Sequence, residues 1–370
     1  PITEFPLFTF LFADLHAHLM ALPVAVLVLA LLSGWLRRCS VAPRARGSLR
    51  GEEATVLGLL AVATGSLAAI NTWDLPTYLA LTGCGLLVVE STRRPLSAAL
   101  VSTAWRFLLV LGLGRLAFWP FHRYFVPGYG RVVPWQGSQT TLTAFLVVHA
   151  LFLLPILIWL LVERDLHHRI KAGARAWVSL LRHRRRARPW LHRVRRLRRA
   201  LPVRWDRIAE GWGWALAALL LLFGRPLEAL LLAVAAPALG LVLAPESRAS
   251  RRWVACWVLV GCGLALAVEH LVLAGDIGRM NTVFKSYLQI WTLWALAAGV
   301  ALALSSLRWP WTRPPDKGDA PRGAGARDLA LGVLWLLLLV VAASYTALAI
   351  PSRIHDRFEG STSKGLDGST

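Results

Sequence analysis

Apolar runs of about 20 residues recur along this chain, and that length crosses a bilayer as a helix. Hydrophobic residues make up 56% of the sequence and charged residues 16%, against about 25% charged residues in an average soluble domain. The pattern predicts an all-α polytopic transmembrane helix bundle, one membrane domain over residues 1–370. About ten spans are expected, at 19–36, 54–71, 76–92, 101–121, 141–162, 209–224, 227–244, 253–272, 282–305 and 328–349.

The pair 209–224 and 227–244 is short and is interrupted by Arg225-Pro226, so either two spans or one re-entrant hairpin fits these residues.

The basic residues alternate from one connection to the next. Of the 41 Lys and Arg residues, 32 lie in the alternate loops 37–50, 93–106, 164–207, 245–252 and 306–327. Basic loops stay in the cytoplasm. We therefore expect a multi-pass plasma-membrane protein with both ends of this chain outside. The net charge of +21 is explained by these loops, so no nucleic-acid partner is predicted.

Two of the basic loops are long. Loop 163–208 interleaves arginines with apolar residues such as Trp177 and Trp190, which favours an amphipathic segment lying on anionic lipid. A protein or nucleic-acid partner is the alternative for this segment. Loop 306–327 is rich in Pro, Gly and Arg and is predicted to be a cytoplasmic connection.

Four strings rich in polar residues lie on the side predicted to be non-cytoplasmic. They are TEFPLFTFLFADLHAHLMALP (3–23), NTWDLPTY (71–78), FHRYFVPGYGRVVPWQGSQT (121–140) and EHLVLAGDIGRMNTVFKSYLQIW (269–291). Ionisable residues at membrane depth are costly and usually face a wet cavity or each other. We therefore expect one shared cavity on the non-cytoplasmic face.

Asp14, His16 and His18 place a carboxylate beside imidazoles whether the segment is extended or helical. Such a set can bind a divalent metal, relay a proton or hold a phosphate, and Asp14 with His18 are the candidate metal ligands. The alternative is that Asp14 caps the helix that follows. Asp74, two residues before Pro76, is either a helix cap or a site residue.

The string 269–291 is the richest in polar residues. Asp276 and Arg279 have the spacing of a helical ion pair, while Glu269 and Asp276 share a face if the segment is helical. Polar residues recur every four positions down an apolar span, which predicts a stripe that lines a cavity. Its members are Asn281, Lys285 and Gln289. Arg279 and Lys285 are the candidate phosphate ligands.

Segment 121–140 is aromatic and cationic, and we expect it to cap the cavity from outside. Arg123 is a candidate binding residue. Trp135 and Tyr129 either stack on a sugar ring or anchor the chain at the membrane interface.

At TEFPLFTFLFADLHAHLMALP, NTWDLPTY, WQGSQT and RMNTVFKSYLQIW, the sequence resembles the YYY-type (Chlor_Arch_YYY) membrane proteins, a family of uncharacterised function. This resemblance implies a GT-C-like fold and a GT-C-type glycosyltransferase that takes a sugar from a polyprenyl-phosphate carrier on the non-cytoplasmic face. It also implies an acidic residue in an outer loop, often with a divalent metal such as Mg or Mn. The tyrosine run and the upstream spans of the family are missing, so we expect a fragment. The main catalytic acid of the family then lies either in the missing part or among the acidic residues present here.

The leading hypothesis gives Asp14, His16, His18 and Asp74 catalytic roles and gives Arg279 and Lys285 the carrier phosphate. Asn281, Gln289, Glu269, Asp276, Arg123 and Trp135 would line the substrate site. A transporter or flippase for a polar or lipid-linked substrate remains open, as does a non-catalytic membrane assembly protein. A transporter would need polar residues that reach the cytoplasmic half.

Overall fold

The computed structural model describes residues 9–10, 16–41, 49–126, 131–164, 204–244, 246–304 and 326–358. It is an all-α helix bundle with very little sheet, which confirms the predicted fold class. The elements are α2 (Ala17–Val41), α3 (Leu49–Ile70), α4 (Leu75–Ser91), α5 (Leu96–Ala117), α6 (Trp119–Tyr124), β1 (Val132–Pro134), α7 (Leu142–Glu163), α10 (Trp205–Leu222), α11 (Pro226–Leu243), α12 (Ala249–His270), β2 (Leu271–Leu273), α13 (Met280–Leu304) and α14 (Ala326–Phe358).

Eight of the described helices are long and apolar enough to cross a membrane. A chain in lipid must satisfy its backbone polar groups internally, and helices do so. Each of the ten predicted spans contains a helix, but two helices fall outside the eight. Helix α4 has only 17 residues, and α10 begins with the charged residues Asp206, Arg207 and Glu210.

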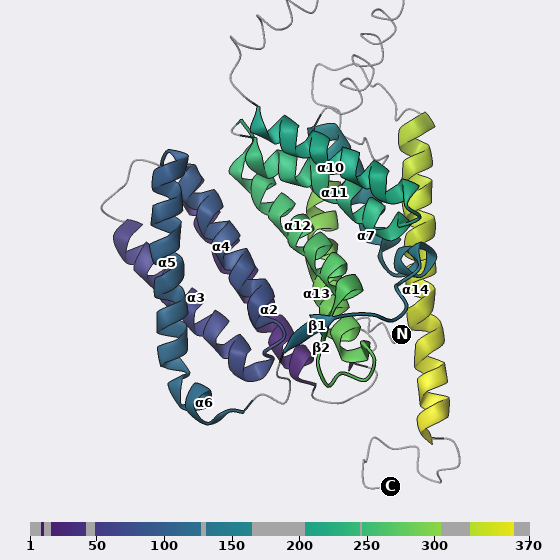
Figure 1. Ribbon diagram of the computed structural model, residues 1–370, viewed down its shortest axis with the longest axis horizontal. Helices are drawn as coiled ribbons and strands as arrows, with labels where there is room; N and C mark the ends of the chain where they lie inside the picture. The colour runs from purple at the N-terminus through teal and green to yellow at the C-terminus, as the bar shows by residue number, and fades with distance from the viewer. Residues whose placement is uncertain are drawn as a thin grey trace, which may run out of the picture.

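The helices form two groups that meet along α12. Figure 1 shows α3, α4 and α5 on one side, α7 and α10–α13 on the other, and α14 at the far edge. Helix α12 packs against α4 and α2 as well as α11 and α13, so it joins the groups. The core contains the fully buried Trp159 and Trp294. An apolar 18-residue window of α14 buries none of its residues, and the helix packs on α7.

Helices α10 and α11 form a hairpin that runs between the two ends of the bundle. Where α10 begins, Arg204 pairs with Glu246, just after α11 ends. Where α11 begins, Glu228 lies 3.8 Å from His270 at the end of α12. The hairpin therefore extends along α12. Helix α11 is among the eight helices suited to cross a membrane and α10 is not, so both predicted arrangements of this hairpin stay predictions.

A short ribbon marks one end of the bundle. Strands β1 and β2 pair antiparallel, with Val132 opposite Leu273 and Pro134 opposite Leu271. The pairing continues at both sides, since Trp135 N donates to His270 O (2.8 Å) and Ala274 N donates to Arg131 O (2.9 Å). We call this end the ribbon end. The opposite end, at residues 37–41, 91–96 and 246–252, is the arginine end.

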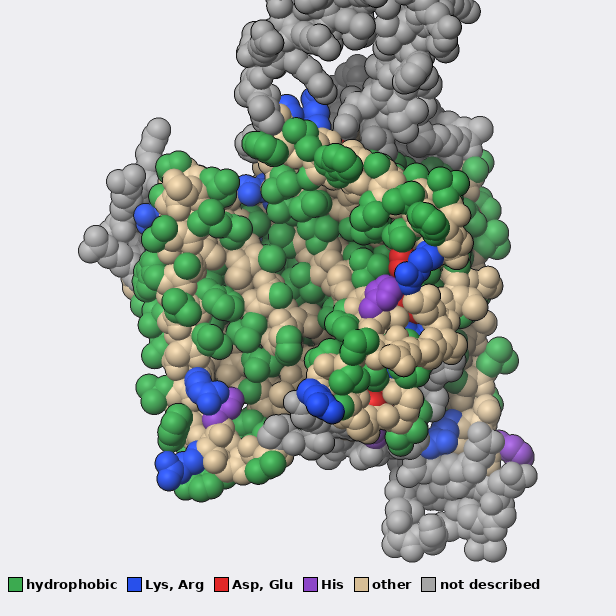
Figure 2. All heavy atoms as spheres, viewed as in Figure 1, with side chains coloured by type: hydrophobic (Ala, Val, Ile, Leu, Met, Phe, Trp, Pro, Cys, Tyr) green, Lys and Arg blue, Asp and Glu red, His purple; other side chains and the backbone are tan. Residues whose placement is uncertain are grey.

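The surface follows the same division. Figure 2 shows hydrophobic side chains over much of the visible face between the two ends, with Lys and Arg side chains mainly towards the top and bottom. Membrane lipids contact such a face. The predicted sidedness places the ribbon end outside the cell and the arginine end in the cytoplasm, and this orientation stays a prediction.

Several predictions concern residues outside the described part of the chain. Asp14 and Tyr129 are among them, and so are most of loop 163–208 and most of loop 306–327.

Candidate functional site

Asp74 occupies the turn between α3 and α4 at the ribbon end. It is the residue before α4, with Pro76 in the first turn of that helix, but its side chain makes no capping hydrogen bond. Only 5% of its surface is exposed. The capping role that the sequence offered for Asp74 is therefore absent, and the carboxylate is available for other contacts inside the bundle.

The surroundings of Asp74 weaken its acidity. Burial raises the pKa of Asp74 to about 6, although polar interactions with Asn71 and Gln289 and the charge of Lys285 act in the opposite direction. A buried carboxylate loses hydration of its charged form, which explains the sign. Asp74 therefore exchanges its proton near neutral pH, as a general base must.

Lys285 and His18 bring the first and last polar strings together. Lys285 Nζ lies 2.9 Å from His18 Nδ1, and an ammonium can only donate. His18 Nε2 lies 3.1 Å from Thr9 Oγ1, so a neutral ring that accepts from Lys285 can donate to Thr9. The His18 ring also stands edge-on to Phe284, with centroids 4.9 Å apart. The imidazole of His18 is thereby fixed in orientation.

Two buried amide atoms beside Asp74 have no hydrogen-bond partner among the described residues: Asn71 Nδ2 and Gln289 Oε1. Gln289 Nε2 donates to Trp73 O at 3.2 Å, which fixes the orientation of that amide. Native proteins pair nearly all buried polar groups, and the exceptions often mark sites for water or ligand. We call Asp74, Asn71, His18, Lys285 and Gln289 the Asp74 cluster.

A second network, the Glu269 clamp, consists of Glu269, Arg279 and Thr140. Glu269 accepts from the Thr140 amide (2.7 Å) and hydroxyl (2.7 Å), and Arg279 Nη1 lies 3.1 Å from Glu269 Oε1. Arg279 also donates to Val268 O (2.8 Å) and Thr140 Oγ1 (3.0 Å). These bonds tie the loop before α7 to the junction of α12 and α13.

Asp276 caps α13 instead of pairing with Arg279. Its Oδ1 accepts from the backbone amide and side chain of Asn281, and its Oδ2 accepts from those of Thr282. Burial opposes ionisation, but these hydrogen bonds outweigh it and lower the pKa of Asp276. The expected Asp276–Arg279 pair is wrong because Arg279 binds Glu269. Glu269 and Asp276 also do not share a helix, since α12 ends at His270.

The polar stripe on α13 meets three different partners. Asn281 binds Asp276, Lys285 binds His18, and Gln289 binds the backbone of Trp73. The four polar strings are thus joined by hydrogen bonds at the ribbon end. A large cavity lies at the arginine end instead, and no residue of this stripe lines it.

Trp135 and Arg123 take different places. The guanidinium of Arg279 lies 5.5 Å from the ring centre of Trp135, and Trp135 Nε1 donates to Ser138 O at 2.9 Å. Trp135 therefore belongs beside the Glu269 clamp. Arg123 is exposed on α6 and lies over the ring of its neighbour Tyr124.

The described residues contain no group of three or more His, Cys, Asp or Glu side chains that could hold a metal. His18 directs its two ring nitrogens at Lys285 and Thr9, and an ammonium beside the imidazole disfavours a cation there. His16 lies near it, with ring centroids 5.1 Å apart. The metal set of Asp14 and His18 stays a prediction, because Asp14 lies outside the described residues.

Several participants were not singled out from the sequence. Thr140 is central to the Glu269 clamp, and Tyr287 reaches it with its hydroxyl 3.5 Å from Thr140 Oγ1. His149 is fully buried in α7, stacks on Phe145 and leaves Nε2 without a partner among the described residues. The sequence did carry a signal for His149, because an ionisable residue within an apolar span is a candidate functional residue. Nothing in the local pattern distinguished Thr140.

Comparison with known proteins supports a membrane role without naming an activity. Residues 1–294, more than half of the chain, match a family described as uncharacterised membrane protein (DUF2298). No curated protein and no solved structure gives a significant match. With eight helices suited to crossing a bilayer, this is a multi-pass integral membrane protein. The chain belongs to the DUF2298 family of uncharacterised membrane proteins.

Proposed function

We propose that this protein is a GT-C-type glycosyltransferase that transfers a sugar from a polyprenyl-phosphate carrier, with its site at the ribbon end. The observation that carries the proposal is the Asp74 cluster. It combines a buried carboxylate with a pKa of about 6, two unsatisfied amide atoms and a lysine on α13, Lys285, whose charge acts on Asp74. A carboxylate base, hydrogen-bonding groups and a cation are what sugar transfer from a phosphate carrier requires.

The roles follow from the chemistry of each group. Asp74 takes the proton of the acceptor hydroxyl, whose oxygen forms the new bond to the anomeric carbon of the sugar. The bond from that carbon to the carrier phosphate breaks, and the phosphate leaves with the electron pair. Lys285 stabilises the charge that develops on the phosphate. Asn71 and Gln289 supply a donor and an acceptor for sugar or acceptor hydroxyls.

Arg279 has a supporting role in this scheme. Its guanidinium is engaged by Glu269, Thr140 and the Val268 carbonyl, and its side chain is 10% exposed. We therefore assign the phosphate to Lys285, and we assign Arg279 and Trp135 to the wall that holds loop 131–140 in place. A divalent metal is not used in any step here.

The test is transfer by the purified chain in proteoliposomes supplied with radiolabelled polyprenyl-phosphate sugars. Asp74→Asn is expected to lower the transfer rate about 100-fold or more, the usual loss when a general base is removed. Lys285→Met is expected to lower it by about 100-fold as well, the usual loss when a group that stabilises developing charge is removed. Glu52→Gln is the matched control, because Glu52 pairs with Arg38 on the surface at the arginine end. Equal transfer by wild type and Asp74→Asn would remove the proposed base.

The same vesicles separate the alternative functions. Substrate flux across the bilayer without any transfer would favour a transporter or flippase. Helices α2, α4 and α13 carry buried apolar side chains between the ribbon end and the arginine end, among them Leu32, Leu81 and Trp294. A transporter would have to open a path through these side chains. If the vesicles showed no sugar transfer and no substrate flux, the non-catalytic assembly role would be the remaining hypothesis.

A further inference from the structure

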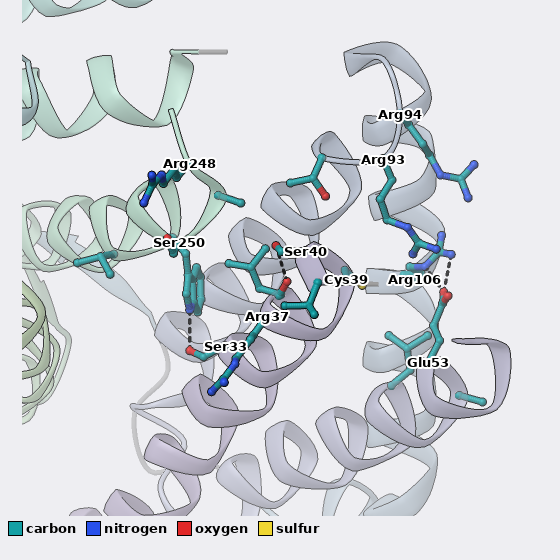
Figure 3. Close-up of a pocket in the computed structure, with 18 of the residues that line it drawn as sticks. Ser33, Arg37, Cys39, Ser40, Glu53, Arg93, Arg94, Arg106, Arg248 and Ser250 are labelled. Carbon is teal, nitrogen blue, oxygen red and sulfur yellow. Dashed lines mark hydrogen bonds and ion pairs between the residues drawn. The ribbon is translucent and has the colours of Figure 1, made fainter. Parts of the chain in front are cut away.

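A cavity of about 1620 Å³ lies at the arginine end, formed by residues of α2, α3, α5, α12 and α13 together with the turn after α4. No member of the Asp74 cluster or the Glu269 clamp lines it. Figure 3 shows Arg37 and Arg248 on one side of the cavity and Arg93, Arg94, Arg106 and Glu53 on the other. The cavity is therefore a site separate from the one described above.

The lining divides into a basic part and an apolar part. Five arginines and a single carboxylate, Glu53, line the cavity. The apolar lining residues include Leu36, Leu57, Leu109, Leu113, Trp253 and Val300. A ligand that suits both parts has an anionic head and a hydrocarbon tail.

The carboxylates near the cavity pair with three of its five arginines, namely Arg93, Arg94 and Arg106. Glu53 accepts from Arg106 Nε at 2.6 Å, and Glu90 pairs with Arg94 at 2.9 Å. Arg37 and Arg248 are exposed and have no carboxylate within ion-pair distance among the described residues. Two arginines that line the cavity thus have no described carboxylate to compensate their charge, and a guanidinium binds phosphate with paired hydrogen bonds.

The cavity also adjoins the surface that faces lipid. Trp105 is 50% exposed and Leu113 is 40% exposed, although both line the cavity. A ligand can therefore enter sideways from the bilayer. A volume of about 1620 Å³ exceeds that of a typical small-molecule pocket, about 300–1,000 Å³, and an inorganic phosphate would leave most of it empty.

We propose that this cavity binds an anionic phospholipid of the adjacent leaflet, with its phosphate against Arg37 and Arg248 and an acyl chain along Leu109 and Leu113. Basic pockets between membrane helices are suited to such headgroups. The proposal does not depend on the glycosyltransferase assignment.

The test is lipid binding to the purified full chain in detergent, followed by native mass spectrometry. The probes are phosphatidylglycerol, phosphatidylcholine with the same acyl chains, and glycerol phosphate. Wild type is expected to bind phosphatidylglycerol at least about tenfold more tightly than phosphatidylcholine, and the double variant Arg37→Ala/Arg248→Ala to lose about tenfold or more in affinity for phosphatidylglycerol. Arg207→Ala, an exposed arginine at the same end that does not line the cavity, is expected to bind like wild type.

A second pair of variants tests the tail. A side chain added at Gly58 would point into open space, and Gly58 lines the cavity; Gly112 is equally open but does not line it. Gly58→Phe is therefore expected to weaken phosphatidylglycerol binding while Gly112→Phe leaves it unchanged. An added Cβ meets no heavy atom within 4 Å at either position, so both proteins are expected to elute and unfold like wild type.

Three results would overturn the proposal. One is equal affinity of wild type for phosphatidylglycerol and phosphatidylcholine. Another is an equal loss in Arg207→Ala and the double arginine variant, which would indicate general charge attraction. The third is competition by glycerol phosphate at the same concentration as the lipid, which would indicate a site for a soluble anion. Retained binding in Gly58→Phe would remove the assigned path of the acyl chain.

Discussion

The Asp74 cluster and the Glu269 clamp share an end of the bundle and use the same residue types in opposite ways. Both contain a buried carboxylate, with exposed fractions of 5% at Asp74 and 1% at Glu269, and both take a basic residue from the beginning of α13 or the segment just before it. The two oxygens of Glu269 bind Thr140 and Arg279 at hydrogen-bond distance. Asp74 instead lies beside unsatisfied amide atoms.

This difference separates a carboxylate whose hydrogen bonds are made within the fold from one that the proposed function gives a ligand-binding role. A buried charge is tolerated when its hydrogen bonds are made, as in the clamp. Where the bonds are incomplete, the charge is disfavoured and the proton affinity rises, as at Asp74. Burial alone therefore does not mark a carboxylate as a candidate for chemistry. Burial beside hydrogen-bonding atoms without a partner is the observation that makes Asp74 the candidate base of the proposed function.

The largest expected effect is on the clamp. Arg279→Ala would leave the Glu269 carboxylate buried without its cation, and breaking a buried pair in this way costs about 3–5 kcal/mol. Denaturant or thermal unfolding of the purified protein measures the loss, with exposed Arg123→Ala on α6 as a control that should unfold like wild type. If Arg279→Ala unfolded no more easily than Arg123→Ala, the clamp would have no structural role.

Asp74 is expected to give a smaller effect with a characteristic pH dependence. Its folded pKa of about 6 is above the unfolded value of about 3.9, so folding favours the protonated acid. Its contribution to stability is complete below about pH 4 and is lost as the pH rises through 6, by roughly 2–3 kcal/mol. The free energy of unfolding of wild type should therefore fall relative to Asp74→Asn over this range. A difference that stays constant with pH would show that Asp74 ionises normally.

Asp276 should behave oppositely and have the smallest effect. Hydrogen bonds to Thr282 and Asn281 hold its folded pKa below the ordinary value, so its contribution is present above about pH 4 and is lost as the pH falls through the folded pKa. Asp276→Ala removes a helix cap and is expected to cost about 1 kcal/mol at pH 7. Unfolding measured at pH 7 and at pH 3 would test this, since equal losses at both values contradict a charged cap.

The bundle could be predicted because its main determinant is local. Length and hydropathy marked each span, and a helix lies within each. The two doubtful cases have local causes, namely the 17 residues of α4 and the three charged residues that open α10. The ribbon was missed because three residues per strand are too few to show an alternating pattern.

The site could be predicted only in part. Spacing by four placed Asn281, Lys285 and Gln289 on one stripe, and each has a partner. The partners themselves depend on tertiary structure, since Lys285 meets His18 across 267 positions of sequence. The pairing of Arg279 with Glu269 instead of Asp276 depends on α12 ending at His270, and boundaries of this kind are the least predictable part of a helix.

The ribbon has a mechanical consequence. Because β1 and β2 exchange backbone hydrogen bonds, and because Thr140 is tied to Glu269, the segment from Arg131 to Thr140 must move together with the junction between α12 and α13. It cannot swing away as an independent flap without losing those bonds. A ligand of the Asp74 cluster is therefore expected to enter and leave sideways between helices. A lipid carrier, as in the proposed function, would reach this entrance by diffusion within the bilayer.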